Sequence, residues 1–419
     1  MIRSTSHSIF FANNGKREQY WAFLKEYRNV AAQMVDQIWS GWGDFNVKTD
    51  KLDFPQYLNY KSFKLDTKLS ARVLSSLTTQ VSGVIRSATE KRRRLLWGRE
   101  KMRSENKPLS NIEKKINKCK LVKPEASHIN PELSSKNMEF FEGPKGFDIW
   151  VSLKSLGVCQ KINIPLKATE MSEKWAKKGK RLNSVMFTGR AAILRFDCQV
   201  EKKKAGKRVG ADEGMKTVLT LSDKQISPKT DIHGHSLESI IDKLVKKRKG
   251  SKAFQKAQDH RKNFINWSIN QLDFSSIQTV ALEKVTNINF GKRASRKMRA
   301  WTNPIIVEKV KRLCEEQGVL VIEQDSTYRS QRCSHCGNVR KSNRKGKLYH
   351  CKHCGFEIDS DLNAALNHEI ELPPLPFGIC GLKLNLKLGF LWNPSGIFTL
   401  SGEELRVPSS SISSKLLVY

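Results

Sequence analysis

The chain has 419 residues, enough for several domains with separate cores. Its 75 lysines and arginines outnumber its 41 aspartates and glutamates, which gives a formal net charge of +34. This excess implies a polyanionic partner, and nucleic acid is the natural candidate. The sequence has no apolar run of membrane-spanning length, and its start lacks the apolar core of a signal peptide, so we expect an intracellular, cytoplasmic protein.

The N-terminal third is predicted to contain one strand and two helices. Residues 1–12 alternate weakly, which is compatible with a strand. Apolar side chains recur at three- and four-residue spacing over residues 16–39 and 65–103, which predicts two amphipathic helices. The second helix ends in a run of cations: Lys91, Arg92, Arg93 and Arg94. Such a run is usually a solvated face, but the charge of the whole chain favours contact with a phosphate backbone.

A change of pattern follows in the middle of the chain. Residues 107–131 are polar and lysine-rich, which indicates a loop or a mobile insertion. Residues 138–200 contain short alternating runs separated by glycines, which predicts the strands of a small sheet or barrel. The charged segment 201–207 is the best candidate for a linker between domains.

The next segments predict an α/β layer with a mixed sheet. Residues 208–222 suggest a hairpin with Asp212 at its mouth, where Glu213 either adds a carboxylate or faces solvent. A strand at residues 277–283 ends in Glu283, and a helix and another strand follow before residue 325. Alternation of strand and helix with short turns is typical of an α/β fold.

Two basic segments in this half are candidate nucleic-acid contacts. A long helix is predicted over residues 237–272, and its middle carries Lys246, Lys247, Arg248 and Lys249. The segment 291–301 interleaves cations with an aromatic ring: Lys292, Arg293, Arg296, Lys297, Arg299 and Trp301. That composition suits a grip on a nucleic-acid backbone with stacking on a base, although a basic loop with a buried tryptophan fits equally well.

Two Cys-x-x-Cys pairs separated by fourteen residues predict a structural zinc site formed by Cys333, Cys336, Cys351 and Cys354. Gly337 and Gly355 follow the second cysteine of each pair, where such a turn needs positive φ. With four thiolates present, the neighbouring His335, His350 and His353 are expected at the surface or against nucleic acid. Four sulfur ligands leave no open position for water, so chemistry must occur elsewhere.

The segments 330–337, 351–355 and 361–367 resemble the C-terminal signature of TnpB proteins and the related compact type V CRISPR effectors. The resemblance implies an RNase H-like RuvC nuclease domain interrupted by a zinc ribbon. It implies that the last catalytic carboxylate is Asp361, in Asp-x-Asn-Ala-Ala, and that Asp212, in Gly-x-Asp-x-Gly, and Glu283 are the other two. Three such carboxylates suit two Mg²⁺ ions that hydrolyse a phosphodiester.

The resemblance also implies a domain layout. The expected parts are a wedge-like β-barrel (1–12 and 138–200), a helical recognition domain (13–137), a linker (201–207), a RuvC-like domain (208–326 and 358–372) and a zinc ribbon that binds target nucleic acid (327–357). The chain departs from the usual family pattern in a C-terminal extension (373–419), which is expected to be partly disordered. A turn at residues 393–396 predicts a hairpin in the extension, packed on the nuclease domain.

The function implied by the resemblance is RNA-guided cleavage of double-stranded DNA beside a short flanking motif, in a prokaryotic cell or a phage. Gln331 and Arg344 join the candidate nucleic-acid contacts. Two alternatives remain: guide-dependent DNA binding without cleavage, and a RuvC-type nuclease or recombinase that uses no RNA. The sequence leaves open the source of the guide RNA, the flanking motif and whether the protein is a monomer or a homodimer.

Overall fold

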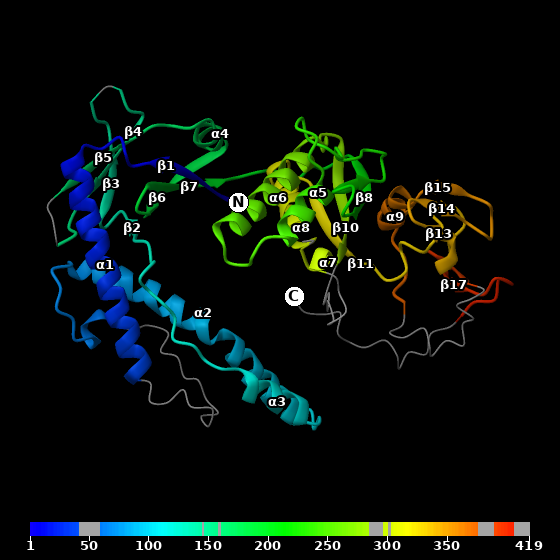
Figure 1. Cartoon of the computed structure of the whole chain (residues 1–419), viewed down its shortest axis with the longest axis horizontal. Helices are drawn as coiled ribbons and strands as arrows, with labels where there is room; N and C mark the ends of the chain where they lie inside the picture. Colours follow the sequence, from blue (N-terminus) through cyan, green and yellow to red (C-terminus); the bar gives the residue numbers. More distant parts are fainter. Residues whose placement is uncertain are drawn as a thin grey trace. The chain divides into compact units, whose positions relative to one another are not determined.

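The computed structural model describes residues 1–41, 59–144, 146–157, 161–284, 296–300, 303–375 and 389–405. The chain divides into two compact units, Met1–Gln199 and Val200–Tyr419 (Figure 1). The division falls immediately before the segment 201–207 that was predicted to be a linker. That segment is not free: Lys203 donates from its Nζ to the carbonyls of Phe274 and Ser275, at 2.6 Å each, within the second unit.

The first unit combines two long helices with two antiparallel sheets. Its elements are β1 (Ile2–Ser8), α1 (Asn14–Gly41), a short 3₁₀ helix (Tyr60–Ser62), α2 (Ala71–Ser104), α3 (Ser110–Lys118), β2 (Glu132–Ser134), β3 (Met138–Phe141), β4 (Ile149–Leu153), β5 (Ile162–Leu166), α4 (Glu170–Lys178), β6 (Gly179–Phe187) and β7 (Ala191–Cys198). One sheet has the order β1-β7-β6-β2 and the other β3-β4-β5. The apolar stripes of α1 and α2 pack with both sheets in one core.

The structure corrects two expectations at the far end of α2. Residues 107–131 contain the helix α3, whose Ile116 is buried. Arg92 is buried as well and donates from Nη1 to the Ile116 carbonyl at 3.2 Å, so it joins α3 to α2 instead of facing a nucleic acid. Arg93 and Arg94 are exposed, and each pairs with Glu90 at 2.8 Å.

The second unit is built on a mixed sheet with the order β11-β10-β8-β9. Its elements are β8 (Lys207–Glu213), β9 (Leu219–Leu221), α5 (Leu237–Val245), α6 (Lys252–Asn270), β10 (Ile277–Lys284), α7 (Arg296–Ala300), α8 (Asn303–Glu316), β11 (Leu320–Asp325), β12 (Asn338–Val339), a 3₁₀ turn (Lys341–Asn343), β13 (Arg344–Lys345), β14 (Leu348–His350), β15 (Glu357–Asp359), α9 (Ser360–Glu369), β16 (Phe390–Asn393) and β17 (Gly396–Phe398). Strand β10 runs parallel to β8 and β11, while β9 is antiparallel to β8, so the predicted mixed sheet is confirmed.

The single long helix predicted over residues 237–272 is wrong, because the chain forms two helices there. Gly250 has φ +81° and stops helical continuation. Ser251 then caps α6 by accepting a hydrogen bond from the Phe254 N–H at 3.1 Å. The cations Lys246 to Lys249 therefore lie in the connection between α5 and α6, where all four are exposed.

The hairpin predicted in the C-terminal extension forms as β16 and β17, but its partner differs from the expected one. β16 pairs antiparallel with β12, next to the cysteine pairs, through Asn338 with Leu391 and Val339 with Phe390. Phe390 and Trp392 are buried there in a small separate core. The extension thus adds two strands to the cysteine-rich region instead of packing on the four-stranded sheet.

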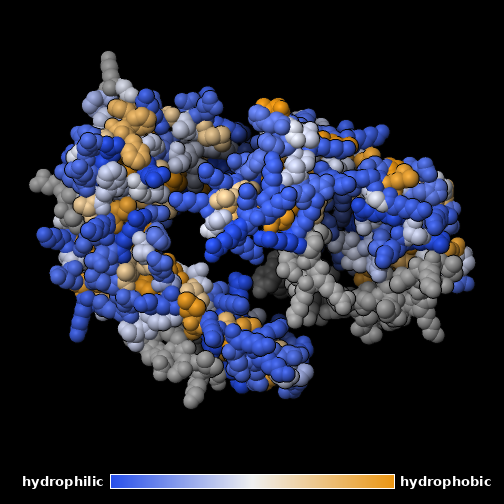
Figure 2. Space-filling model, viewed as in Figure 1, coloured by the Kyte–Doolittle hydropathy of each residue, from blue (hydrophilic) through white to orange (hydrophobic). Residues whose placement is uncertain are grey.

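The helices that the structure describes include none long and apolar enough to cross a membrane. On the face of the molecule shown in Figure 2, hydrophilic residues predominate and apolar residues are scattered. This surface agrees with the excess of charged residues in the sequence.

Close packing of α9 on β8 depends on Gly210. Strand side chains alternate, so Val209 and Ala211 enter the core of the sheet while Gly210 and Asp212 face the other side, where α9 lies. A Cβ at Gly210 would lie 2.0 Å from the Ala365 carbonyl oxygen and 2.3 Å from the Glu369 nitrogen. Only glycine leaves room for the helix backbone at this distance.

We predict that Gly210→Ala destabilises the second unit by roughly 2–3 kcal/mol, because α9 must move away from the strand. Urea unfolding followed by circular dichroism measures the change. Gly83→Ala on the exposed face of α2, where a Cβ meets nothing within 4 Å, is the control and should be neutral or stabilising. Equal stability of Gly210→Ala and the parent protein would contradict the packing described.

Candidate active site and metal centre

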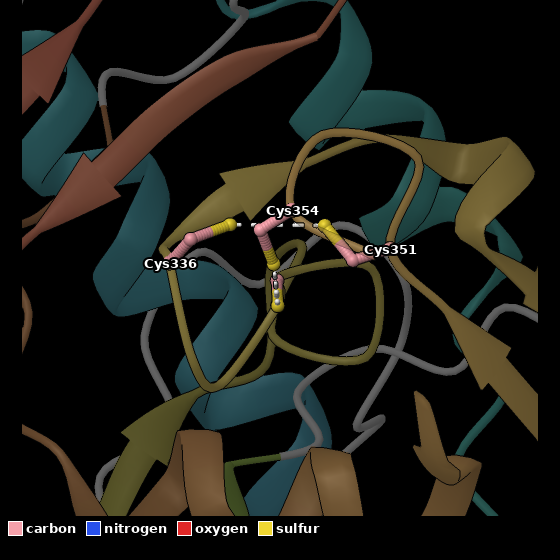
Figure 3. Close-up of side chains that lie close together, drawn as sticks. Cys336, Cys351 and Cys354 are labelled. Atoms are coloured by element: carbon pink, nitrogen blue, oxygen red, sulfur yellow. Dashed lines mark hydrogen bonds between the residues drawn. The ribbon is translucent and has the colours of Figure 1, made fainter. Parts of the chain in front are cut away.

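The four predicted cysteine ligands converge. The Sγ atoms of Cys333, Cys336, Cys351 and Cys354 all lie within 4.8 Å of one another, and Figure 3 shows three of these side chains turned toward a common point. The Sγ atoms of Cys333 and Cys354 are 3.8 Å apart, and those of Cys336 and Cys351 are 3.7 Å apart. Two sulfurs on one tetrahedral zinc, with bonds of about 2.3 Å, are separated by about 3.8 Å. These sulfur separations fit a zinc ion and are too long for disulfides.

Each cysteine pair lies in a tight turn closed by a backbone hydrogen bond. The Gly337 N–H donates to the Cys333 carbonyl at 2.9 Å, and the Gly355 N–H donates to the Cys351 carbonyl at 2.8 Å. Both glycines have positive φ, +80° and +75°, as the sequence predicted. The two halves of the site therefore share one local geometry.

The three neighbouring histidines are exposed and stay outside the sulfur cluster. His335 stacks on Phe356 with ring centroids 5.3 Å apart, and the His350 ring lies 2.6 Å from Glu357 Oε1. The four cysteines suffice for a closed structural site.

A buried polar network joins the cysteine region to helix α9. The carbonyl of Arg332 accepts hydrogen bonds from the amides of Asn363 and Asn367, at 2.8 and 2.7 Å. Arg332 in turn donates from Nη1 to Asn367 Oδ1 at 2.5 Å and from Nε to the Trp392 carbonyl at 2.6 Å. Arg332, Asn363 and Asn367 are all buried. The start and orientation of α9 thus depend on the ribbon and on the C-terminal hairpin.

The three predicted carboxylates, Asp212, Glu283 and Asp361, line one cavity of about 460 Å³. β8 and β10 run parallel with Gly210 opposite Ala281, so Asp212 and Glu283 come two residues later at the same edge of the sheet. Asp361 enters from the first turn of α9, where Asp359 caps the helix by accepting from the Asp361 N–H at 2.8 Å. Residues distant in sequence are therefore brought to one site.

The remaining cavity walls include Lys347 and Ser326, which the sequence did not point out, and Arg344, which was predicted only as a nucleic-acid contact. Lys347 pairs with Asp361, and Arg344 Nη2 lies 3.6 Å from Asp361 Oδ1. Ser326 hydrogen-bonds to Glu283. Arg344 and Lys347 both lie on the hairpin of β13 and β14. Their approach to Asp361 follows from the fold and could not be predicted from the sequence.

Burial raises the pKa of the acids on the sheet. Burial, reinforced by the Glu283 carboxylate, raises the pKa of Asp212 to about 7. Burial raises the pKa of Glu283 as well, and burial together with Glu283 raises that of Glu213 well above its usual range. Glu213 lies in the cavity wall, so of its two possible placements the structure shows the one near the site. A cavity that holds several carboxylates at this proximity is suited to a divalent cation.

A buried histidine that the sequence did not point out completes the cavity wall. His368 lies on α9 seven residues after Asp361, which places both on one face of the helix. One ring nitrogen lies within 4.8 Å of carboxylate oxygens of Asp212 and Glu283. Burial, with a smaller effect of Arg329, lowers the pKa of His368 to about 3. The seven-residue spacing is the signal that could have identified it.

A second histidine group lies in the same unit. Asp231, His235 and His260 offer ligand atoms within 4.8 Å of one another. Asp231 already accepts the backbone N–H groups of His233 and His235, at 2.9 and 2.8 Å, and the ring of His235 lies 3.2 Å from its second oxygen. Hydrogen bonds within the turn hold Asp231 and His235 together, and the His260 ring of α6 packs edge-on against His235 with centroids 5.0 Å apart.

The other residues predicted to contact nucleic acid differ in their exposure and in their partners within the chain. Lys297 pairs with Glu238 at 2.8 Å and Asp242 at 3.0 Å, so acids of the same chain balance its charge. Arg296 is exposed and donates to the Lys247 carbonyl, and Gln331 is half-buried near the cysteines. The predictions for Lys292, Arg293, Trp301 and the side chain of Arg299 fall outside the described residues.

Comparison with known proteins finds a family match within the second unit. Residues 305–368 match the family description "Cas12f1-like, TNB domain". A CRISPR-associated endodeoxyribonuclease Cas12f1 of Sulfoacidibacillus thermotolerans is 33% identical over 135 residues, which is 32% of this chain and 31% of that protein. A TnpB-like protein of Aquifex aeolicus is 37% identical over 79 residues, 18% of this chain and 26% of that protein. The matches thus span about a third or less of these relatives.

Solved structures show more distant likenesses over longer stretches. A complex of Cas12f1 with sgRNA and target DNA aligns at a TM-score of 0.46 and 16% identity, covering 87% of this chain and 82% of that chain. CasPhi-2 (Cas12j) bound to crRNA and phosphorothioate-DNA aligns at a TM-score of 0.48 and 10% identity, covering 88% and 91%.

The second unit is thus an α/β domain in which a four-cysteine ribbon lies beside a carboxylate-lined cavity. Residues 305–368 match the Cas12f1-like TNB domain, and the curated relatives that the chain resembles are Cas12f1 and TnpB-like proteins. The resemblance inferred from the cysteine and Asp-x-Asn-Ala-Ala motifs is confirmed.

The raised pKa of Asp212 predicts a pH-dependent stability when no magnesium is added. The pKa is about 7 in the folded protein and about 3.9 in an unfolded chain, so the folded state holds the proton more tightly. Ionisation of Asp212 therefore costs stability progressively from about pH 4 to pH 7, and the cost is complete above that. Asp212→Asn should raise the thermal midpoint at pH 8, and the gain should shrink as the pH falls toward 4.

Asp361→Asn is the matched comparison, because Asp361 pairs with Lys347 and Arg344. We expect that variant to lower the midpoint at pH 8, since it leaves two cations without their carboxylate. A midpoint for Asp212→Asn that is unchanged or lower at pH 8 would contradict the electrostatics described.

Proposed function

We propose that this chain is an RNA-guided DNA endonuclease with a single RuvC-like cutting site, formed by Asp212, Glu283 and Asp361. The observation that carries the proposal is that these three carboxylates, from separate segments, line one cavity. Support comes from the adjoining four-cysteine ribbon and from the relatives, which include Cas12f1 endodeoxyribonucleases. Because the matches cover only part of those relatives, the activity of the whole chain is inferred.

The donor atoms of the cavity fit two Mg²⁺ ions, since magnesium takes carboxylate oxygens and keeps several waters. Bound there, the metal would supply an activated water and stabilise developing negative charge. Asp212, Glu283 and Asp361 would hold the ions, and Ser326 orients Glu283 through its hydrogen bond. Arg344 and Lys347 neutralise Asp361 in the free protein and contact the scissile phosphate when DNA enters.

The parts of the chain take the roles that the family layout implies. The two sheets of the first unit take the place of the wedge-like barrel, and α1, α2 and α3 form the recognition domain. The sheet of the second unit with α9 forms the RuvC-like, RNase H-like domain. Residues 327–357 form the zinc ribbon, with one Zn²⁺ on the four cysteines, and β16 and β17 are an addition to it.

Guide RNA and double-stranded DNA are the proposed partners. The net charge of +34 supports a nucleic-acid partner, and the exposed Arg93, Arg94 and Lys246 to Arg248 are the proposed backbone contacts. Contacts of this kind release counterions, so binding should weaken steeply as salt rises.

One observation favours the alternative of guide-dependent DNA binding without cleavage. Asp361 is engaged by two cations, and a fourth acid, Glu213, lies in the same cavity. If the cations are never displaced from Asp361, metal binding is incomplete and the protein binds its target without cutting it. The experiment below separates this alternative from the proposed nuclease.

The test is to purify the protein from cells that carry its native locus, sequence the bound RNA, and incubate the complex with Mg²⁺ and a plasmid library with randomised flanks. We expect a defined RNA, cleavage beside a short motif and one zinc per chain by elemental analysis. Asp212→Ala and Glu283→Gln should reduce cleavage roughly 1,000-fold or more while target binding persists.

Asp259→Ala is the control, because Asp259 is exposed on α6 and does not line the cavity. A defined RNA with target binding and no cutting would replace the nuclease with the binding-only alternative. Absence of a specific RNA, with cleavage retained, would leave a RuvC-type nuclease that uses no guide.

A further inference from the structure

His368 is the unexplained group in the cavity. It is 2% exposed, and its Nδ1 has no hydrogen-bond partner. A buried polar atom without a partner lowers the stability of the folded state, so such an atom calls for an explanation. His368 is also the histidine whose ring nitrogen lies within 4.8 Å of carboxylate oxygens on both Asp212 and Glu283.

The backbone around His368 holds the ring at this place. Gly210 brings β8 against α9 so closely that a Cβ would lie 2.7 Å from the His368 carbonyl carbon. Arg329 donates to the carbonyls of Asn367 and, at 3.0 Å, Ile370, which fixes the end of the helix on both sides of His368. The ring is therefore carried by a rigid part of the fold, opposite two carboxylates.

The donor set of two carboxylates and one imidazole differs from an all-oxygen set. Magnesium takes oxygen ligands almost exclusively, whereas imidazole nitrogen suits divalent transition metals. A nitrogen donor raises affinity along the series that runs from Mn²⁺ toward Cu²⁺ and adds little for Mg²⁺.

We propose that His368 is a direct ligand of a divalent metal ion held by Asp212 and Glu283, and that it gives this cavity a preference for transition-metal ions such as Mn²⁺ over Mg²⁺. This inference rests on the proposed metal site of the nuclease. His368 would be the fourth metal-binding residue beside the three carboxylates. Its nitrogen would determine which ion binds between β8, β10 and α9.

The test uses Mn²⁺ as the probe on the full-length, zinc-loaded protein. Electron spin-echo spectroscopy of bound Mn²⁺ detects a directly coordinated imidazole through its nitrogen coupling, and ¹⁵N-histidine labelling confirms the source. We expect this coupling in the parent protein and its loss in His368→Leu. Titration calorimetry should show Mn²⁺ binding weakened about tenfold or more in His368→Leu, with Mg²⁺ binding changed much less.

His260→Gln is the matched control, because His260 belongs to the second histidine group with Asp231 and His235. Nitrogen coupling that survives His368→Leu and disappears in His260→Gln would overturn the proposal. Labelled parent protein without any nitrogen coupling would overturn it too, even if His368→Leu failed to fold.

Asp212→Ala separates this inference from the proposed function. If Asp212→Ala abolishes Mn²⁺ binding but His368→Leu leaves affinity and spectrum unchanged, the carboxylate site stands and His368 is not a ligand. If Asp212→Ala leaves Mn²⁺ binding unchanged, the cavity is not the metal site and both proposals fail.

Discussion

The buried guanidinium of Arg332 is the constraint on which the second unit depends. It has no carboxylate partner in the described contacts, and its charge is satisfied by the Trp392 carbonyl and the Asn367 and Asn393 side-chain oxygens. Burial lowers its pKa, which reflects the cost of removing the charge from water. Because those oxygens belong to α9 and to the C-terminal hairpin, the arginine fixes both against the cysteine turn from which it extends.

Because Arg332 fixes α9, both ends of this helix contribute side chains to the carboxylate-lined cavity. The first turn carries Asp361 to the cavity, and the last turn carries His368 to the same cavity, since both lie on one face of a short helix. Gly210 lets the helix approach β8 so closely that a ring nitrogen of His368 lies within 4.8 Å of a carboxylate oxygen of Asp212. The ribbon is therefore a structural support for the proposed cutting site, while the Arg344 and Lys347 hairpin makes it part of the cavity wall.

Residue patterns within single segments predicted most helices, strands and metal-binding turns. They could not predict contacts between segments that are distant in the sequence. Cysteine spacing and glycine position predicted the metal turns, and apolar runs that end in Asp212 and Glu283 predicted strands that deliver carboxylates. A glycine followed by a capping serine, Gly250 and Ser251, is a sequence signal for the end of one helix and the start of another. The helical spacing of apolar residues on both sides nevertheless favoured a single helix. The pairing of β16 with a two-residue strand and the burial of Arg92 under α3 depend on contacts between distant segments, which no local pattern encodes.

The most direct test of this account is DNA cleavage by Arg332→Met combined with Asn367→Leu, measured with zinc content on the same preparation. Removing both partners avoids leaving a buried charge unpaired. We expect the four cysteines to keep their zinc while cleavage falls about 100-fold or more, because α9 no longer holds Asp361 in the cavity. Zinc retained together with unchanged cleavage would contradict it.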